Sequence, residues 1–379
     1  MNGIIHKTMA IQNISGLNNE DDLIHSIFHT IDEIFALVRP RKLLFIAIDG
    51  VAPLAKLHQK RSKRYLGLKE ALDKAKAIKI IKSKILVNGR VLPESADQNE
   101  SFDEQCITPG TSFMLHLSDC LRYYVYNRMN TKSAWQSLRI ICSDANVAGE
   151  GEHKIMNFIR QQCLQTNYDV NTRHVLFGTD ADLIILGLST HLDNVSIMRD
   201  KLNLDCPPLC ELCRQQGHDY KKCQGISKEN QNILPMTPIH EKPKYIFVHL
   251  SKLRERLHDY FYNNCDFTFP WNFERFIDDW IFLCFLNGND LLPDIPSFEI
   301  YQNSIDNLLE IYVRNVPAHN DYLTYNGQLN LTLLEIILTE FGKNEENIFK
   351  DRFQISQQWK IKQEELNQQQ IKPAVNLQE

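Results

Sequence analysis

Apolar side chains recur at two different periods along this chain, and the two periods predict alternating helices and strands. From Leu23 to Val38 they fall at every third or fourth position, which is the spacing of one helix face, and Pro40 ends the pattern. The continuous apolar run Leu43–Ile48 is typical of a strand covered on both faces. Further strands are expected over Leu138–Cys142, His174–Phe177 and Tyr245–Leu250, and further helices over Leu54–Lys84, Ser112–Arg128, Lys154–Leu164 and Phe273–Leu286. Strands that alternate with helices indicate an α/β fold with a mostly parallel sheet.

Two segments depart from this alternation and suggest domain boundaries. Residues 201–242 are rich in Cys, Pro, Gln and Lys, which indicates an insertion with a small fold of its own. Residues 343–379 are rich in Gln, Glu, Asn and Lys, which is typical of either a solvated helix or a disordered tail. The rest, residues 1–200 and 243–342, would then form one α/β domain whose C-terminal part is helical.

Composition places the chain among globular intracellular proteins. Its 379 residues are 43% hydrophobic, enough for a large core. The longest apolar runs fall far short of the roughly 20 residues that a membrane span needs, and the start lacks the charged-then-apolar order of a signal peptide. We therefore expect no membrane partner. Four of the ten cysteines lie within residues 206–223, which favours a metal cluster over a disulfide framework.

Positive charge is concentrated in one segment of an acidic chain. Residues 54–84 hold 9 Lys and 2 Arg against 2 acids, a local charge of +9 in a chain whose net charge is -5. A charge run is often only the solvated face of a helix. Clustered cations are also what neutralisation of phosphates requires, so contact with a polyanion is the alternative.

Acidic residues gather where the predicted strands end. Ligands of open α/β sheets bind beyond the carboxyl ends of the strands, so we expect these acids to converge on one crevice. They are Asp49 after the first strand, Glu150 and Glu152 after the second, and Asp180 and Asp182 after the third. Asp290, which follows the helix expected over Phe273–Leu286, is a sixth candidate. Any one of them could instead be a helix cap or a turn residue.

So many carboxylates repel one another unless cations neutralise them. Mg²⁺ or Mn²⁺ suits oxygen ligands, and a pair of such ions about 3.5–4 Å apart can hold the attacking and leaving oxygens of a phosphodiester. The acids of the GEGE and DAD segments alternate with small Gly151 and Ala181, which keep the approach to the ions open.

A second metal site is expected in the insertion. Cys210, Cys213, His218 and Cys223 have zinc-knuckle spacing, and three thiolates with one imidazole complete a closed, structural Zn²⁺ tetrahedron. Cys206 is a spare thiol nearby. The alternative is chance spacing.

Five blocks of the sequence together resemble a known enzyme family. AIDGVAPLAK, FDEQCITPGTSFM, GEGEHKIMNFIR, GTDADLIILGL and FLCFLNGNDLLPDIPSFEI stand in the order of the signature blocks of the 5′→3′ exoribonuclease (XRN) family, over residues 1 to about 312. The resemblance implies the N-terminal nuclease region, with a Rossmann-like or PIN-like 5′-nuclease sheet. It assigns metal-binding roles to the six acids named above. The implied reaction is processive hydrolysis of 5′-monophosphorylated RNA to mononucleotides, with two divalent ions.

The family also places a basic pocket for the terminal phosphate just after the DGVAP block. Here that region offers Lys56, Lys60, Lys63 and Arg64, one to two helical turns apart. Relatives typically carry Arg where Leu54 stands, Gln where Lys60 stands and Arg where Lys63 stands, so bidentate contacts are reduced while charge is kept. His6 matches a family histidine that stacks on the first base.

An insertion with a zinc knuckle at this position resembles the nuclear branch of the family and not the cytoplasmic branch. The resemblance therefore implies a nuclear enzyme of mRNA and rRNA processing and RNA degradation, with a protein partner in a nuclear RNA-processing complex. The knuckle would either stabilise the insertion or contact RNA. Family members also carry a metal-binding Asp on an opening strand just before MNGIIH. Because this chain starts at that Met, either the sequence is short at this end or the protein lacks both the strand and the acid. A catalytically impaired RNA- or protein-binding scaffold and a structure-specific DNA nuclease are the alternatives.

Overall fold

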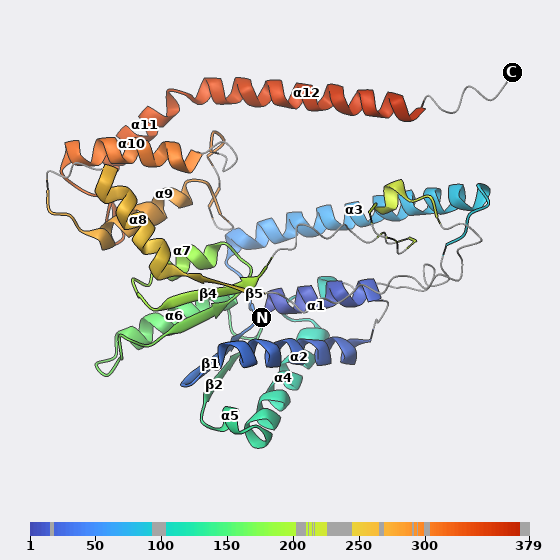
Figure 1. Ribbon diagram of the computed structural model, residues 1–379, viewed down its shortest axis with the longest axis horizontal. Helices are drawn as coiled ribbons and strands as arrows, with labels where there is room; N and C mark the ends of the chain where they lie inside the picture. The colour runs from blue at the N-terminus through green and yellow to red at the C-terminus, as the bar shows by residue number, and fades with distance from the viewer. Residues whose placement is uncertain are drawn as a thin grey trace. The chain divides into compact units, whose positions relative to one another are not determined.

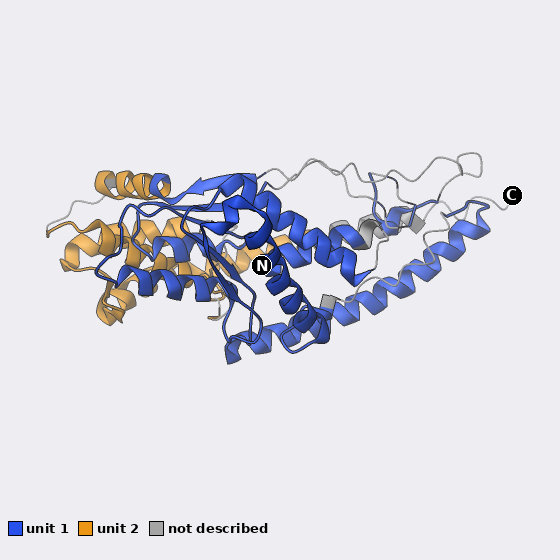
Figure 2. Cartoon of the chain, turned by 90° about the horizontal axis from the view of Figure 1, so that it is seen from below, with its two compact units in different colours: residues 1–252 blue, residues 253–379 orange. Residues whose placement is uncertain are grey.

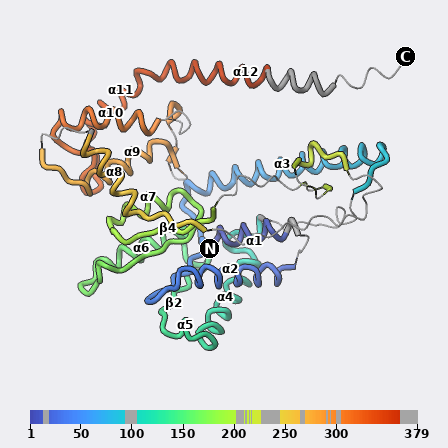
Figure 3. The backbone as a smooth tube through the Cα atoms, in the orientation of Figure 1, coloured from blue at the N-terminus to red at the C-terminus, as the bar shows by residue number. Residues whose placement is uncertain are grey.

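The computed structural model divides the chain into two compact units, residues 1–252 and 253–379 (Figure 2). The residues that it describes are 1–15, 19–92, 104–201, 210, 212–213, 215, 217–225, 245–264, 269–289, 292–293, 295–298 and 304–371. Figure 3 traces the backbone through both units. No helix among these residues is long and apolar enough to cross a membrane.

The first unit holds two small sheets, and parallel pairing predominates. Strands β1 (Leu43–Ala47) and β2 (Arg139–Ser143) pair in parallel. The second sheet has the order β3 (His174–Phe177), β4 (Val195–Asp200) and β5 (Tyr245–His249), with β3 parallel and β5 antiparallel to β4 (Figure 1). The predicted α/β fold is confirmed. The predicted strands agree with the observed ones to within one residue at each end, while β4 was not predicted.

Helices flank these strands in the first unit. They are α1 (Asn2–Ser15), α2 (Glu20–Val38), α3 (Leu54–Val87), α4 (Ser112–Thr131), α5 (Ser133–Gln136), α6 (Gly151–Cys163) and α7 (Asp182–Leu188), with short 3-10 turns at Glu104–Cys106 and Tyr220–Lys222. Local chemistry sets their ends. Asn19 caps α2 by accepting a hydrogen bond from Asp21 N, and Thr111 caps α4 in the same way through Met114 N. At its other end, α2 stops at Arg39, which has a left-handed backbone.

Aromatic stacking joins α2 to α4 and α5 in the core of this unit. The ring centroids of Phe28 and Tyr124 lie 4.5 Å apart, and those of Phe35 and Trp135 also lie 4.5 Å apart. Ring pairs at this separation add to the stabilisation that burial already gives. The predicted apolar face of residues 23–38 is therefore the face that packs on the neighbouring helices.

The second unit is mostly helical. Its elements are α8 (Leu250–Asn264, which begins in the first unit), α9 (Phe273–Phe285), α10 (Ser304–His319), a two-stranded hairpin of β6 (Thr324–Tyr325) and β7 (Gln328–Leu329), α11 (Leu331–Gly342) and α12 (Glu345–Ile371). For the segment from residue 343, which was expected to be a solvated helix or a disordered tail, the structure has the helix α12 up to residue 371.

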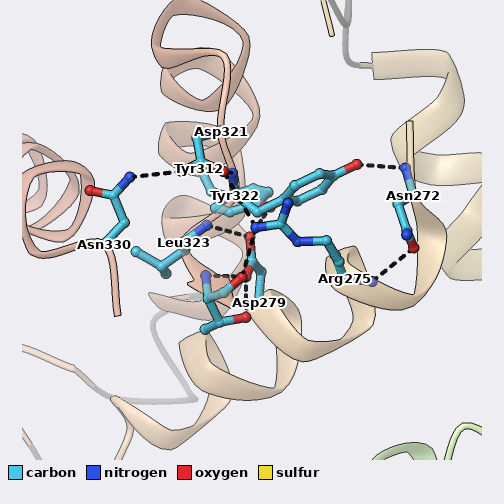
Figure 4. A network of polar contacts seen from close by, with 9 residues as sticks. Asn272, Arg275, Asp279, Tyr312, Asp321, Tyr322, Leu323 and Asn330 are labelled. Atoms are coloured by element: carbon cyan, nitrogen blue, oxygen red, sulfur yellow. Dashed lines mark hydrogen bonds and ion pairs between the residues drawn. The ribbon is translucent and has the colours of Figure 1, made fainter. Parts of the chain in front are cut away.

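A buried carboxylate organises the second unit. Asp279 of α9 is fully buried and accepts four hydrogen bonds (Figure 4). The donors are the Tyr312 hydroxyl at 2.6 Å, Leu323 N at 2.7 Å, and Thr324 N and Oγ1 at 2.7 and 2.6 Å. Burial raises the pKa of Asp279, and these donors oppose the rise. One side chain thus connects α9, α10 and the hairpin.

Replacing Asp279 by Asn should destabilise the second unit selectively. An amide keeps one oxygen acceptor, but its NH₂ group faces N–H and O–H groups that are themselves donors. The donors that bonded the replaced oxygen are then left without an acceptor. We expect a loss of about 2–4 kcal/mol in the opening free energy of amides in α9 and α10. Native-state hydrogen exchange measures this loss. The matched control is Glu310→Gln, an exposed carboxylate-to-amide change on α10. Equal effects of the two changes would contradict this role of Asp279.

Candidate active site

Two loops at the carboxyl ends of β1 and β2 are hydrogen-bonded to each other along the backbone. Gly50 N donates to Gly149 O at 2.8 Å, and Gly149 N donates to Val51 O at 2.9 Å. A Cβ atom on Gly50 would lie 1.8 Å from Val147 O, so no larger residue fits this approach. The two loops carry the acids on either side of these glycines and hold them at one edge of the sheet.

Asp49 is fixed by contacts on both sides. Its Oδ1 accepts a hydrogen bond of 2.8 Å from Gly151 N, the first residue of α6, and its own N–H donates to Asn2 Oδ1 at 3.0 Å. A Cβ on Gly151 would lie 3.3 Å from that carboxylate oxygen and 3.2 Å from Ala47 O. The carboxylate therefore sits at the positive end of α6, where a negative charge is stabilised.

Lys154 ties the two strand ends together beneath these acids. Its Nζ donates to Ile48 O at 2.8 Å and to Asp144 O at 2.9 Å. Burial lowers the pKa of Lys154, while Asp49 and Asp144 act to raise it. The sequence prediction missed this residue. Its position one helical turn after Glu150, on the face of α6 turned to the strand ends, is the signal that could have found it.

Glu150 is buried and paired with a cation. Lys56 Nζ lies 2.6 Å from Glu150 Oε1, and the two side chains are only 13% and 6% exposed. His153, which was also not predicted, has its Nε2 4.0 Å from Glu150 Oε2. One ligand atom each of Glu150, Glu152 and His153 lies within 4.8 Å of the others, so these three side chains could hold a metal ion.

The pKa of Glu152 depends on its burial and on acids that follow both β2 and β3. Burial raises its pKa to about 7, and Asp180, Glu150 and Asp182 add to the rise while Lys56 opposes it. Asp180 and Asp182 are themselves close, because Asp180 Oδ1 accepts a hydrogen bond of 3.1 Å from Asp182 N. Carboxylates that raise the pKa of a neighbour in this way favour a cation among them.

The structure thus gathers five of the six predicted acids at one edge of the sheets. Asp290, the sixth, lies outside the described residues. The predicted phosphate-pocket residues occupy the first turns of α3, where Lys60 is half-buried and Lys63 and Arg64 are exposed. Arg64 Nη2 donates to Thr108 Oγ1 at 2.9 Å, and Lys56 is the one paired with Glu150. His6 is exposed on α1.

The predicted zinc ligands converge on one point. One ligand atom each of Cys210, Cys213, His218 and Cys223 lies within 4.8 Å of the other three, and Cys213 Sγ is 3.2 Å from His218 Nε2. The three cysteines are buried, and burial raises the pKa of the Cys213 thiol to about 12. Three sulfurs and one imidazole in this arrangement could hold a Zn²⁺ ion, which would stabilise the thiolates. Cys206 lies outside the described residues.

Without divalent cations, Glu152 should make the protein less stable as the pH rises. Its pKa is about 7 when folded and near 4.5 as a free side chain, so ionising it costs more in the folded state. We expect Glu152→Gln to match the parent near pH 4.5 and to melt about 2 °C or more higher at pH 8 in EDTA. Thermal melts at both pH values measure this. The exposed Glu70→Gln change is the control, and a difference that is independent of pH would contradict the assignment.

Two family models together match most of the chain. The model of the XRN 5′–3′ exonuclease N-terminus matches residues 1–201, and that of the Xrn1 helical domain matches residues 270–379. The family match therefore extends beyond residue 312, where the resemblance was expected to end. The end was set too early because the helical part lacks conspicuous motifs.

Curated relatives match nearly the whole chain. The 5′-3′ exoribonuclease 2 homolog of Drosophila melanogaster is 45% identical over 96% of this chain and 40% of its own length. The 5′-3′ exoribonuclease 2 of Gallus gallus is 45% identical over 93% of this chain and 37% of its own length. That of Schizosaccharomyces pombe is 40% identical over 92% of this chain and 34% of its own length. The chain spans about two fifths or less of these relatives. On the strength of the two domain matches and these identities, it belongs to the XRN 5′–3′ exonuclease family.

Proposed function

We propose that this chain is the nuclease region of a 5′→3′ exoribonuclease that hydrolyses 5′-monophosphorylated RNA processively to mononucleotides. The observation that carries the proposal is the set of carboxylates from successive strand ends around Glu152, which add to the effect of burial in raising its pKa to about 7. Membership of the family and relatives named 5′-3′ exoribonuclease 2 support the same reaction.

The proposed cofactors are two Mg²⁺ or Mn²⁺ ions. Oxygen-only ligands of net negative charge suit these hard cations, which would activate water and stabilise charge on the phosphate. The proposed ligands are Asp49, Glu150, Glu152, Asp180 and Asp182, together with Asp290 from outside the described residues.

The neighbouring cations have separate proposed roles. Lys154 keeps the ends of β1 and β2 together through two backbone carbonyls, and so sets the spacing of the acids that follow them. Lys56 neutralises Glu150, and a metal ion at Glu150 would compete for the same oxygen. Lys56 would then be available, with Lys60, Lys63 and Arg64, to a terminal phosphate of the RNA. His6 would stack on the first base.

The knuckle and the cellular setting complete the proposal. We assign a structural Zn²⁺ ion to Cys210, Cys213, His218 and Cys223, because their ligand atoms converge. The names of the relatives favour the nuclear branch of the family. We therefore propose a nuclear location, a role in RNA processing and degradation, and a protein partner in that setting.

Defined substrates test this proposal directly. In Mg²⁺, we expect the chain to release mononucleotides from 5′-monophosphate RNA, and to act at least about tenfold more slowly on 5′-hydroxyl RNA or on DNA. Asp180→Asn and Asp182→Asn should each lower the rate by about 100-fold or more, because each removes a proposed metal ligand. Single-turnover kinetics with end-labelled RNA measure these rates.

The matched control is Asp169→Asn, an exposed acid that precedes β3 and pairs with Lys42 at 3.1 Å, at the opposite end of the strands. It should keep the parent rate. Equal degradation of all three substrates would contradict recognition of the 5′ end. A parent rate that Asp180→Asn leaves unchanged would contradict the metal site.

A further inference from the structure

Helix α3 is long, basic and almost without a core contact of its own. Its 34 residues extend about 50 Å at 1.5 Å per residue. Throughout residues 54–87, all of which the structure describes, the one buried side chain is Ile85, which is 3% exposed. Apolar residues earlier in the helix, such as Leu66 and Leu72, are more than half exposed. Since packing supplies most of the stability of protein helices, the far end of α3 depends on whatever covers Ile85.

The zinc-knuckle residues cover it. Ile85 shares one buried cluster with Leu212 and with the three predicted zinc-binding cysteines, and Ile78 and Ile81 pack against the same cluster. Gly225 follows the last ligand so closely that a Cβ there would lie 2.5 Å from Ile85 Cγ2. The knuckle and the last turns of α3 therefore share a single small core, to which the three cysteines belong. In Figure 1 the 3-10 turn of the knuckle lies against α3.

Polar contacts surround this core. Lys74 Nζ lies 5.4 Å from the ring centroid of Tyr220, which stands between His218 and Cys223. Arg90, just beyond the helix, donates from Nη1 to both Gln224 O and Gln224 Oε1 at 3.4 Å. The knuckle thus contacts α3 and the chain after it over residues 74–90. At the other end of the helix, Lys56 pairs with Glu150 of the carboxylate site.

We propose that the zinc-loaded knuckle is a clamp for the far end of α3, and that zinc occupancy decides whether residues 74–92 remain ordered. The inference rests on the zinc assignment made above and not on nuclease activity. Coordination of one ion by four ligands stabilises a small insertion that has too few apolar residues to form a core of its own. Loss of the ion releases the four ligands, uncovers Ile78, Ile81 and Ile85, and frees the helix end to fray. The knuckle then serves the basic helix as a positioning element.

Hydrogen exchange with mass spectrometry tests the clamp on the whole chain. Samples are compared with zinc bound, after zinc removal by a zinc-selective chelator with Mg²⁺ kept present, and as the Cys213→Ser variant. We expect amides of residues 76–92 to exchange about tenfold faster or more when zinc is lost, while those of β1 and α6 stay unchanged. Faster exchange confined to residues 217–225 would overturn the proposal. So would a chain that holds no zinc and still protects residues 76–92.

A matched pair of variants separates the clamp from the ion. Ile85→Ala removes the shared core contact without touching a ligand, so it should keep one zinc per chain and still speed exchange in residues 76–92. Ile80→Ala makes the same change on the same helix at a side chain that is 56% exposed, and it should leave exchange unchanged. Zinc content of both variants is measured in parallel. Equal exchange in the two zinc-loaded variants would show that α3 is held by something other than the knuckle.

Discussion

Repulsion among carboxylates at the carboxyl ends of the strands is the constraint that the rest of the first unit must satisfy. The loops that carry these acids are joined backbone to backbone through Gly50 and Gly149, and Lys154 bridges the strand ends beneath them. Lys56 neutralises Glu150, and the start of α6 stabilises Asp49. Burial raises the pKa of Glu152, and the neighbouring acids add to the rise. A site that concentrates negative charge at a cost to stability is typical of one that binds cations.

Much of this arrangement could be predicted because the strands have strong local signals. β1 and β3 are short apolar runs that end in acids, so both the sheet and the gathering of those acids follow from the sequence. β4 was missed because Ser196 and Arg199 break its apolar run. The buried Asp279 was missed because a carboxylate in a helix looks like a surface residue until its four donors, from α10 and the hairpin, are known.

Tertiary contacts set the limit of such prediction. The lysines of α3 were expected to face solvent, and the ligand spacing of the knuckle indicated its metal site. Neither pattern shows that Ile85 meets cysteines more than a hundred positions later in the chain. Likewise, Lys56 was placed in a phosphate pocket by resemblance, while its ion pair with Glu150 depends on how the first turn of α3 approaches α6. Through this ion pair, Lys56 links the basic helix α3 to the carboxylate site.

The most direct test of the account is to count and locate the divalent ions. Electron paramagnetic resonance of the chain titrated with Mn²⁺ reports both the number bound and their mutual coupling. The account predicts two Mn²⁺ ions per chain with the magnetic coupling of ions about 3.5–4 Å apart, and loss of that coupling in Asp180→Asn. Binding of a single uncoupled ion, or a coupled pair that Asp180→Asn leaves intact, would contradict the two-metal carboxylate site.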